Sequence, residues 1–317
     1  MTLLSRRKLL ENALRGAAGA WLGSMTLGRS AHAQLRAARL QPAGGAPLDL
    51  GGGMHVLRAG ATNVLAVIDA DGVALVDGGA STESTALLES VAELSGGKTV
   101  HTLFNTHWHP DHTGSNEPLG AAGATIVSHV NTKLWLTTDV TWPWNGETVL
   151  PLPKSALPTR TFYTEDELEV GGRTVRCGHL RDCPHTDGDI YVYFPDENVM
   201  AVGDAVRGDG WPEIDWWTGG WIGGLVGGLD IILTVSNDET RFIPSRGPLL
   251  SRADLVEQYR MYNVIWERLL KVLYSGGGPA EALAAQPTKE FDEAMGEPEA
   301  FIVRAFESMW PYLSPDA

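Results

Sequence analysis

The stretch Asn105-Thr106-His107-Trp108-His109-Pro110-Asp111-His112-Thr113-Gly114 places three histidines and one aspartate within six consecutive positions. It follows the apolar run Val100–Phe104, which is typical of a buried strand, so the cluster is expected on the loop that leaves a strand end. His107 and His109 are two residues apart and therefore share a face of extended chain. Their ring nitrogens are expected to point at one centre.

Asp111 and His112 follow a proline, and the turn there is expected to direct both side chains toward a second centre close to the first. Imidazole nitrogens and carboxylate oxygens are ligands that zinc accepts. Because coordinating groups at this density are rare by chance, the stretch predicts a metal site rather than a polar surface loop.

The same stretch resembles the signature His-x-His-x-Asp-His of the metallo-β-lactamase superfamily, and the resemblance extends from about Pro47 to about Tyr262. It implies an α/β fold, a four-layer αββα sandwich, here with extra C-terminal helices. It also implies that His185, in the run Cys183 to Asp189, is the third ligand of the first metal beside His107 and His109.

The same resemblance implies roles for two aspartates. Asp204, in Gly203-Asp204-Ala205, resembles the bridging aspartate of the family and is expected to contribute to the second site. Asp77, in Val76-Asp77-Gly78-Gly79, would support the metal loop without binding metal. A simple turn aspartate is an equally good interpretation of Asp77.

The chain departs from the family pattern after the last expected core strand. The family commonly has Pro-Gly-His-Gly there, and Arg246 stands at the place of that histidine. A guanidinium has no lone pair for a metal and brings a positive charge. The sequence therefore predicts one tightly held zinc and a second site, formed by Asp111, His112 and Asp204, that is weak or empty. Arg246 is predicted to pair with Asp111 or Asp204, or to receive a substrate carboxylate.

These residues predict a zinc-dependent hydrolase in which metal-bound hydroxide attacks an ester, lactone, thioester or β-lactam carbonyl. Asp111 and Asp204 are the predicted catalytic carboxylates, with Asp111 orienting the water or acting as a base. One alternative is a mononuclear iron oxidoreductase resembling sulfur dioxygenases, which would use His107, His185 and Asp204. The other alternative is a non-catalytic metal-binding homologue.

Two tryptophan-bearing segments are candidate walls of a substrate pocket. Residues 139–160 are predicted to form an irregular loop over the site, and residues 207–222 hold four tryptophans among glycines. Trp142 and Trp211 are predicted to bind substrate, because aromatic side chains are favoured where small molecules bind. Packing on the domain is the alternative for both segments.

The N-terminus resembles an export signal. Residues 1–33 contain Arg6-Arg7, a broken apolar run and the small-x-small pattern Ala31-His32-Ala33, as in twin-arginine signal peptides. The run falls short of the ~20 apolar residues of a spanning helix, so no stable membrane insertion is expected after cleavage, and an uncleaved N-terminal anchor is the alternative. Periplasmic localisation follows. The remaining boundaries are predicted as a linker at 34–50, the metallo-β-lactamase-fold domain at 51–275 and a C-terminal helical extension at 276–317.

Charge and the remaining histidines and cysteines narrow the function further. The formal net charge of −15 disfavours nucleic acid and anionic membranes, so a small-molecule substrate is predicted. Single histidines lack the convergence that a site needs. We therefore interpret four of them as structural or exposed, and both cysteines as free or bridged thiols rather than ligands: His55, His101, His129, His179, Cys177 and Cys183.

Overall fold

The computed structural model describes residues 46–313. The predicted signal peptide at 1–33 lies outside the described residues, as do most of the predicted linker and residues 314–317. The last part of that linker differs from the prediction, because β1 (Leu48–Gly51) pairs with β2 and so begins the first sheet.

The first sheet has seven strands in the order β1-β2-β3-β4-β5-β6-β9. After β1 they are β2 (Met54–Ala59), β3 (Thr62–Ile68), β4 (Val73–Val76), β5 (Val100–Phe104), β6 (Thr125–His129) and β9 (Arg160–Phe162). The strands β4, β5, β6 and β9 run parallel to one another, so their carboxyl ends lie along one edge. The predicted strand at 100–104 is confirmed, and the histidine-rich loop leaves from this edge.

The second sheet has five strands: β10 (Glu165–Val170), β11 (Arg173–His179), β12 (Ile190–Phe194), β13 (Val199–Gly203) and β14 (Arg241–Pro244). Both β11 and β13 are antiparallel to β12, and β13 is parallel to β14. The loops after β11, β13 and β14 therefore leave from the same edge. A backbone hydrogen bond from Ile190 N to Thr106 O joins this edge to the loop after β5.

Alternation along the strands explains why the two sheets pack face to face. In β3, Leu65 and Val67 belong to the core between the sheets, whereas Val64 and Ala66 point to the outer face. That outer face is covered by α3 (Ser84–Ser95). Glu83 occupies the cap position of α3 without a side-chain bond.

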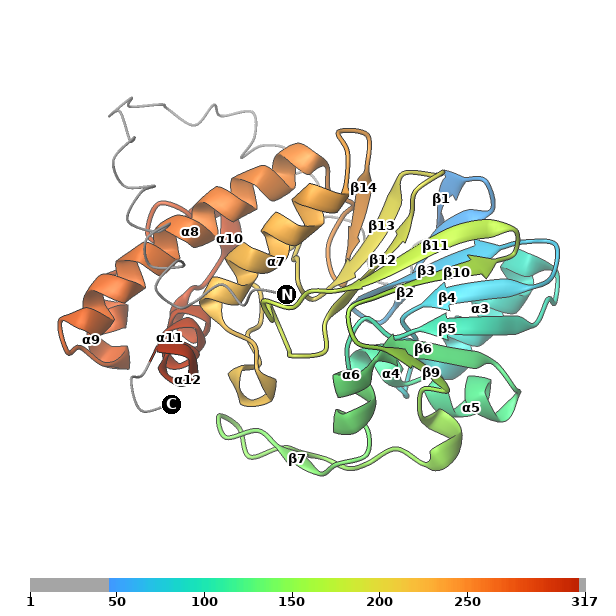
Figure 1. The fold of residues 1–317 in the computed structure, drawn as a ribbon, viewed down its shortest axis with the longest axis horizontal. Coiled ribbons are helices and arrows are strands. Elements are labelled where there is room, and N and C mark those ends of the chain that lie inside the picture. The colour runs from blue at the N-terminus through green and yellow to red at the C-terminus, as the bar shows by residue number, and fades with distance from the viewer. Residues whose placement is uncertain (1–45, 314–317) are drawn as a thin grey trace. The chain divides into compact units, whose positions relative to one another are not determined.

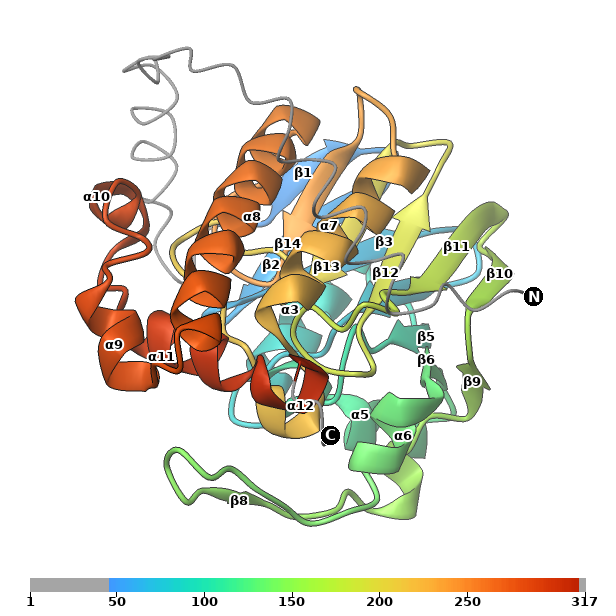
Figure 2. The same cartoon turned by 60° about the vertical axis from the view of Figure 1, so that its left-hand side comes forward.

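The outer face of the second sheet is covered by α7 (Ile222–Val235), α8 (Arg252–Tyr274) and the C-terminal helices (Figures 1 and 2). These helices are α9 (Pro279–Ala284), α10 (Asp292–Met295), α11 (Glu299–Glu307) and α12 (Trp310–Leu313). Short helices follow β5 and β6: α4 (Pro110–Thr113), α5 (Asn116–Ala121) and α6 (Val130–Trp135). The predicted four-layer αββα sandwich with extra C-terminal helices is confirmed.

Glycines in α7 let it lie directly on the loop that carries His185. A Cβ atom on Gly224 would stand 2.2 Å from the carbonyl oxygen of Cys183, and one on Gly228 would stand 2.9 Å from Pro184. Glycine weakens a helix interior, so its presence here points to a packing requirement. The close approach fixes the backbone just before His185.

The segment predicted as an irregular loop at 139–160 contains regular structure. The strands β7 (Val140–Thr141) and β8 (Thr148–Val149) form a hairpin, which we call the tryptophan hairpin (residues 140–149), and η1 (Lys154–Ala156) follows. Backbone bonds from Trp142 N to Glu147 O and from Gly146 N to Trp142 O close its turn. Strands of two residues are too short to show alternation, so no pattern indicated them.

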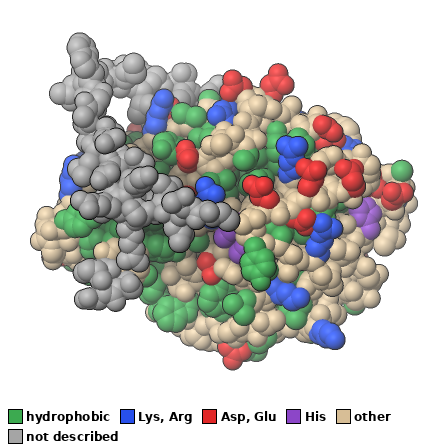
Figure 3. Space-filling model, in the orientation of Figure 1, with side chains coloured by type: hydrophobic (Ala, Val, Ile, Leu, Met, Phe, Trp, Pro, Cys, Tyr) green, Lys and Arg blue, Asp and Glu red, His purple; other side chains and the backbone are tan. Residues whose placement is uncertain are grey.

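No helix in residues 46–313 combines the length and the apolar character that crossing a membrane requires. On the face that Figure 3 shows, acidic and basic side chains are interspersed.

Candidate metal centre

The loops after β5, β11 and β13 bring four buried side chains together at the shared edge of the two sheets. His107, His109, His185 and Asp204 each offer one ligand atom, and these atoms all lie within 4.8 Å of one another. The Nδ1 atom of His109 stands 3.1 Å from Nε2 of His185. Asp204 Oδ2 lies 3.5 Å from His107 Nε2 and 3.9 Å from His185 Nε2. The three predicted histidines therefore do face one centre, and Asp204 joins them.

A second group shares Asp204 and contains Asp111 and His112. His112 Nε2 stands 3.1 Å from Asp204 Oδ2 and 3.8 Å from Asp111 Oδ2. Nη2 of Arg246 donates a hydrogen bond of 2.8 Å to Asp111 Oδ2. Of the two carboxylates considered as partners of Arg246, the structure pairs it with Asp111, while Asp204 accepts a hydrogen bond from Ser245 Oγ.

The hydrogen bonds on the outer side of each ring indicate which nitrogens carry lone pairs. His109 Nε2 lies 2.9 Å from Asp215 Oδ2, and His185 Nδ1 lies 2.8 Å from the carbonyl oxygen of Glu213. Both partners only accept, so these outer nitrogens donate and the inner nitrogens keep their lone pairs. Two lone pairs 3.1 Å apart repel each other unless a proton or a metal ion lies between them. The arrangement fits a bound metal.

Two buried imidazole nitrogens without hydrogen bonds also indicate a metal site. Nε2 of His107 and Nε2 of His112 are buried and make no hydrogen bond, although the second of them lies only 3.1 Å from Asp204 Oδ2. A buried polar atom without a partner costs free energy, and native structures rarely keep one without a reason. Both atoms face Asp204, so metal binding would satisfy them together.

Asp77 holds the histidine-rich loop after β5 in place. Its carboxylate accepts hydrogen bonds from the backbone N and Oγ1 of Thr106 and from Nδ1 of His112 at 2.9 Å. Asp77 has φ of 64°, a left-handed conformation that is uncommon outside glycine. The supporting role implied by the family resemblance agrees with these contacts.

The loop of His185 is fixed by its own aspartate. Asp189 is buried and accepts hydrogen bonds from the backbone N atoms of His185 and Thr186 and from Thr186 Oγ1. Together with the Glu213 carbonyl on the ring, these bonds leave the imidazole one orientation. His185 therefore enters the site preorganised.

Sequence reasoning missed Asp215. This buried carboxylate accepts from His109 Nε2, from Thr218 Oγ1 at 2.7 Å and from Trp142 Nε1 at 3.1 Å. Asp215 is 106 residues from His109 in the chain. No spacing pattern links residues so far apart. The tryptophans around Asp215 indicated an aromatic segment but gave no sign of its acidic member.

The protonation of His107 and of the carboxylates suits a metal, whereas burial is outweighed by the neighbouring carboxylates, which raise the pKa values of His112 and His185, so metal binding there would displace a proton. Burial, followed by the neighbouring imidazoles, holds the pKa of His107 well below its ordinary value, so its ring is neutral at pH 7. Burial by itself would raise the pKa of Asp204, but the surrounding histidines, His112 first, outweigh it and hold that pKa well below normal. Burial is outweighed in the same way at Asp215, where the bond from His109 helps to lower the pKa to about 2. Neutral imidazole and ionised carboxylate are the forms that bind metal.

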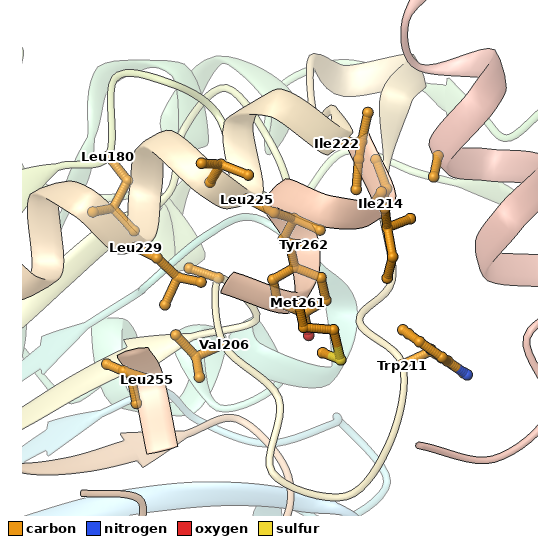
Figure 4. Close-up of a cluster of buried hydrophobic side chains, with 14 of the residues drawn as sticks. Leu180, Val206, Trp211, Ile214, Ile222, Leu225, Leu229, Leu255, Met261 and Tyr262 are labelled. Atoms are coloured by element: carbon orange, nitrogen blue, oxygen red, sulfur yellow. The ribbon is translucent and has the colours of Figure 1, made fainter. Parts of the chain in front are cut away.

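The two predicted substrate-binding tryptophans differ in position. The ring of Trp142 lies 5.4 Å from that of His109, beside the metal centre. Trp211 instead stacks on Phe301 at 4.6 Å and donates from Nε1 to the carbonyl oxygen of Gly296. Figure 4 shows Trp211 at the margin of the buried hydrophobic cluster to which α7 and α8 contribute. This position fits the packing alternative, because α11 supplies an aromatic partner that the sequence pattern did not reveal, and the substrate-binding role of Trp211 stays a prediction.

The histidines interpreted as structural stay outside both groups within residues 46–313. His101 Nε2 lies 3.1 Å from Asp69 Oδ2, and His129 stacks on His179 with ring centroids 3.8 Å apart. Cys177 and Cys183 are free thiols.

Asp215→Asn is expected to weaken metal binding by about 10–100-fold, because the variant keeps the shape of the side chain but loses the charge that holds His109 Nε2–H. Competition with a chelator for the metal measures the change. The exposed Asp196, on the turn between β12 and β13, provides the control variant Asp196→Asn, which should bind metal as the wild type does. Equal affinities in all three proteins would contradict the role given to Asp215.

Comparison with known proteins agrees with this geometry. The sequence profile of the metallo-beta-lactamase superfamily matches residues 57–273. A hydroxyacylglutathione hydrolase from Hyphomonas neptunium (strain ATCC 15444) is 34% identical over 110 residues, which cover 34% of this chain and 34% of that relative. The chain therefore matches about a third of that relative's length.

Two solved structures share the fold at low sequence identity. The stereoselective inverting sec-alkylsulfatase from Pseudomonas sp. has a TM-score of 0.62 and 15% identity, and the match covers 84% of this chain and 50% of that one. The metallo-beta-lactamase from Pontibacter korlensis has a TM-score of 0.54 and 17% identity, and the match covers 69% of this chain and 98% of that one. Since the family profile matches more than half of the sequence, this chain belongs to the metallo-beta-lactamase superfamily.

Proposed function

We propose that this protein is a metal-dependent hydrolase that holds one zinc ion. The observation that carries the proposal is the convergence of buried lone-pair nitrogens from His107, His109 and His185 on the carboxylate of Asp204. Nitrogen and oxygen donors of this kind suit zinc. When bound, zinc would supply Lewis-acid chemistry, polarising a carbonyl oxygen and lowering the pKa of water.

We assign different roles to the two carboxylates of the site, Asp204 and Asp111. Asp204 is buried and lies between the two groups, so it supports the metal, while the three imidazoles would leave zinc one position for water. The side chain of Asp111 is 31% exposed and can meet a water molecule and a substrate. Its hydrogen bond from Arg246 fixes its orientation. Asp111 is therefore the group we assign to orient the attacking water and to accept its proton.

Arg246 limits the second group to a weak or empty site. Its guanidinium stands 2.8 Å from the Asp111 oxygen that a second metal would need, and it carries a fixed positive charge. With its side chain 30% exposed, it can also receive a carboxylate of the substrate. Trp142, beside His109, would contact the rest of that substrate.

The substrate class remains an activated carbonyl: an ester, lactone, thioester or β-lactam. The relative named hydroxyacylglutathione hydrolase supports the thioester member of this set. Export to the periplasm belongs to the same proposal and rests on residues 1–33, which lie outside the described residues.

Elemental analysis of the purified protein, together with hydrolysis assays on all four carbonyl classes, tests the proposal. We expect about one zinc per chain, the count for a site with a single complete ligand set, and turnover of at least one class. One iron per chain with substrate-dependent oxygen uptake would favour the oxidoreductase alternative instead. Stoichiometric zinc without turnover on any of the four classes would favour a metal-binding protein that is not an enzyme.

A further inference from the structure

Arg304 lies on α11, beyond the residues 57–273 that match the superfamily. Its side chain is only 21% exposed, although it is a cation on a short surface helix. It makes two contacts with segments of the sandwich domain. Nη1 donates a hydrogen bond of 2.6 Å to Glu213 Oε1, and the guanidinium carbon stands 4.3 Å from the ring centroid of Trp144. An addition to the family fold therefore reaches the segments around the metal centre.

The contact with Trp144 leads to His109 through the tryptophan hairpin. Trp144 stacks on Trp142, with ring centroids 6.0 Å apart. Trp142 donates from Nε1 to Asp215, and Asp215 holds the outer nitrogen of His109. A series of direct contacts therefore connects Arg304 to His109, one of the histidines that face the candidate metal centre.

The contact with Glu213 leads to His185. The backbone oxygen of Glu213 accepts from His185 Nδ1, while its side chain accepts from Arg304. The same arginine therefore links two of the three histidines to one helix.

Side chains of the tryptophan hairpin already pack against Trp108 and Leu136, so the contact with Arg304 bears on its turn rather than on its strands. Two strands of two residues give few backbone bonds, and an isolated two-stranded hairpin is marginally stable in water. Trp144 lies at its turn, where contacts from the rest of the chain decide whether the hairpin stays in place. A cation over an indole face is an attractive contact of this kind.

We propose that Arg304 is a positioning residue that latches the tryptophan hairpin over the metal centre, so that the C-terminal extension sets how readily the site opens to its substrate. The proposal deepens the proposed function, but only its kinetic consequence rests on that function. The order of the hairpin can be measured without any substrate.

Hydrogen exchange of the full-length protein tests the latch directly, by comparing wild type with Arg304→Met. We expect the amide protection of Trp142 and Gly146, which donate the backbone bonds of the hairpin turn, to fall on the order of 10-fold in the variant. Arg304→Lys should restore part of it, because an ammonium still binds an indole face. Unchanged protection in Arg304→Met would overturn the proposal.

Arg268 provides the matched control. It forms an ion pair with Glu290 at 2.6 Å, joining α8 to the same C-terminal extension away from the hairpin. Arg268→Met should leave the protection of Trp142 and Gly146 unchanged, and equal loss in both variants would show general loosening, which overturns the latch. If Arg304→Met does not fold, Trp144→Leu removes the other half of the contact and is expected to give the same loss.

Kinetics separate the latch from the proposed hydrolase. With a hydrolysed substrate, Arg304→Met should raise KM by about 10-fold and change kcat less, because a covering hairpin contributes to binding in the ground state as well as in the transition state. Loss of kcat alone would overturn this role. If the wild type hydrolyses nothing but Arg304→Met still loses amide protection, the latch stands and the proposed function fails.

Discussion

His185→Ala is expected to lose the tightly bound metal and to reduce kcat/KM by at least about 10²–10³-fold, the loss seen when one group that stabilises a transition state is removed. His185 is fully buried, and its ring is fixed by the Glu213 carbonyl with Nε2 directed at His109 and Asp204. Alanine offers no donor atom, and the cavity it leaves admits solvent among the remaining ligands. Elemental analysis and assays on the hydrolysed substrate measure both effects.

His55→Ala is the control, since His55 lies on β2 outside both metal groups and its nearest acidic partner is Asp49 at 3.8 Å. It should keep the metal and the activity. Retention of stoichiometric metal and near-normal turnover in His185→Ala would show that the three-histidine centre is not where the chemistry occurs.

Arg246→His is expected to raise the zinc content from about one ion per chain to about two, because an imidazole supplies the missing donor and removes the fixed charge. The residues already in place for the second ion are Asp111, His112 and Asp204. Metal analysis after removal of loosely bound zinc gives the count.

Arg246→Gln separates charge from ligation. It removes the cation but offers no imidazole, so the zinc content should stay at about one, the number of complete ligand sets. Two tightly held ions already present in the wild type would contradict the proposed role of Arg246. A second ion in Arg246→Gln would show instead that charge alone keeps the site empty.

The parts of the site that are close in sequence could be predicted, and the parts that depend on tertiary contact could not. Dense spacing was sufficient to identify His107, His109, Asp111 and His112, because a single loop carries all four. His185 and Asp204 both follow expected strands, which made them candidates, but their roles were assigned from the family resemblance. Asp215 gave no local signal at all, since its role exists only where the loop after β13 meets the loop after β5.

The aromatic residues show the same division. Density of tryptophan predicted an aromatic surface near the site, and Trp142 does lie beside His109. The pattern could not tell Trp142 from Trp211, whose partner Phe301 is on a helix 90 residues later in the chain and outside the family match. Arg304 could not be singled out for a related reason: one arginine on an amphipathic helix is ordinary, and its contact with Trp144 appears only in the folded chain.

Asp204 has one oxygen, Oδ2, that faces both metal groups. Binding at the two centres is consequently linked, and the linkage is reciprocal: an ion in the first centre changes the affinity of the second by the same factor as an ion in the second changes that of the first. Arg246 then behaves as a permanently bound effector. Its charge acts on the shared carboxylate of Asp204, although its own hydrogen bond goes to Asp111.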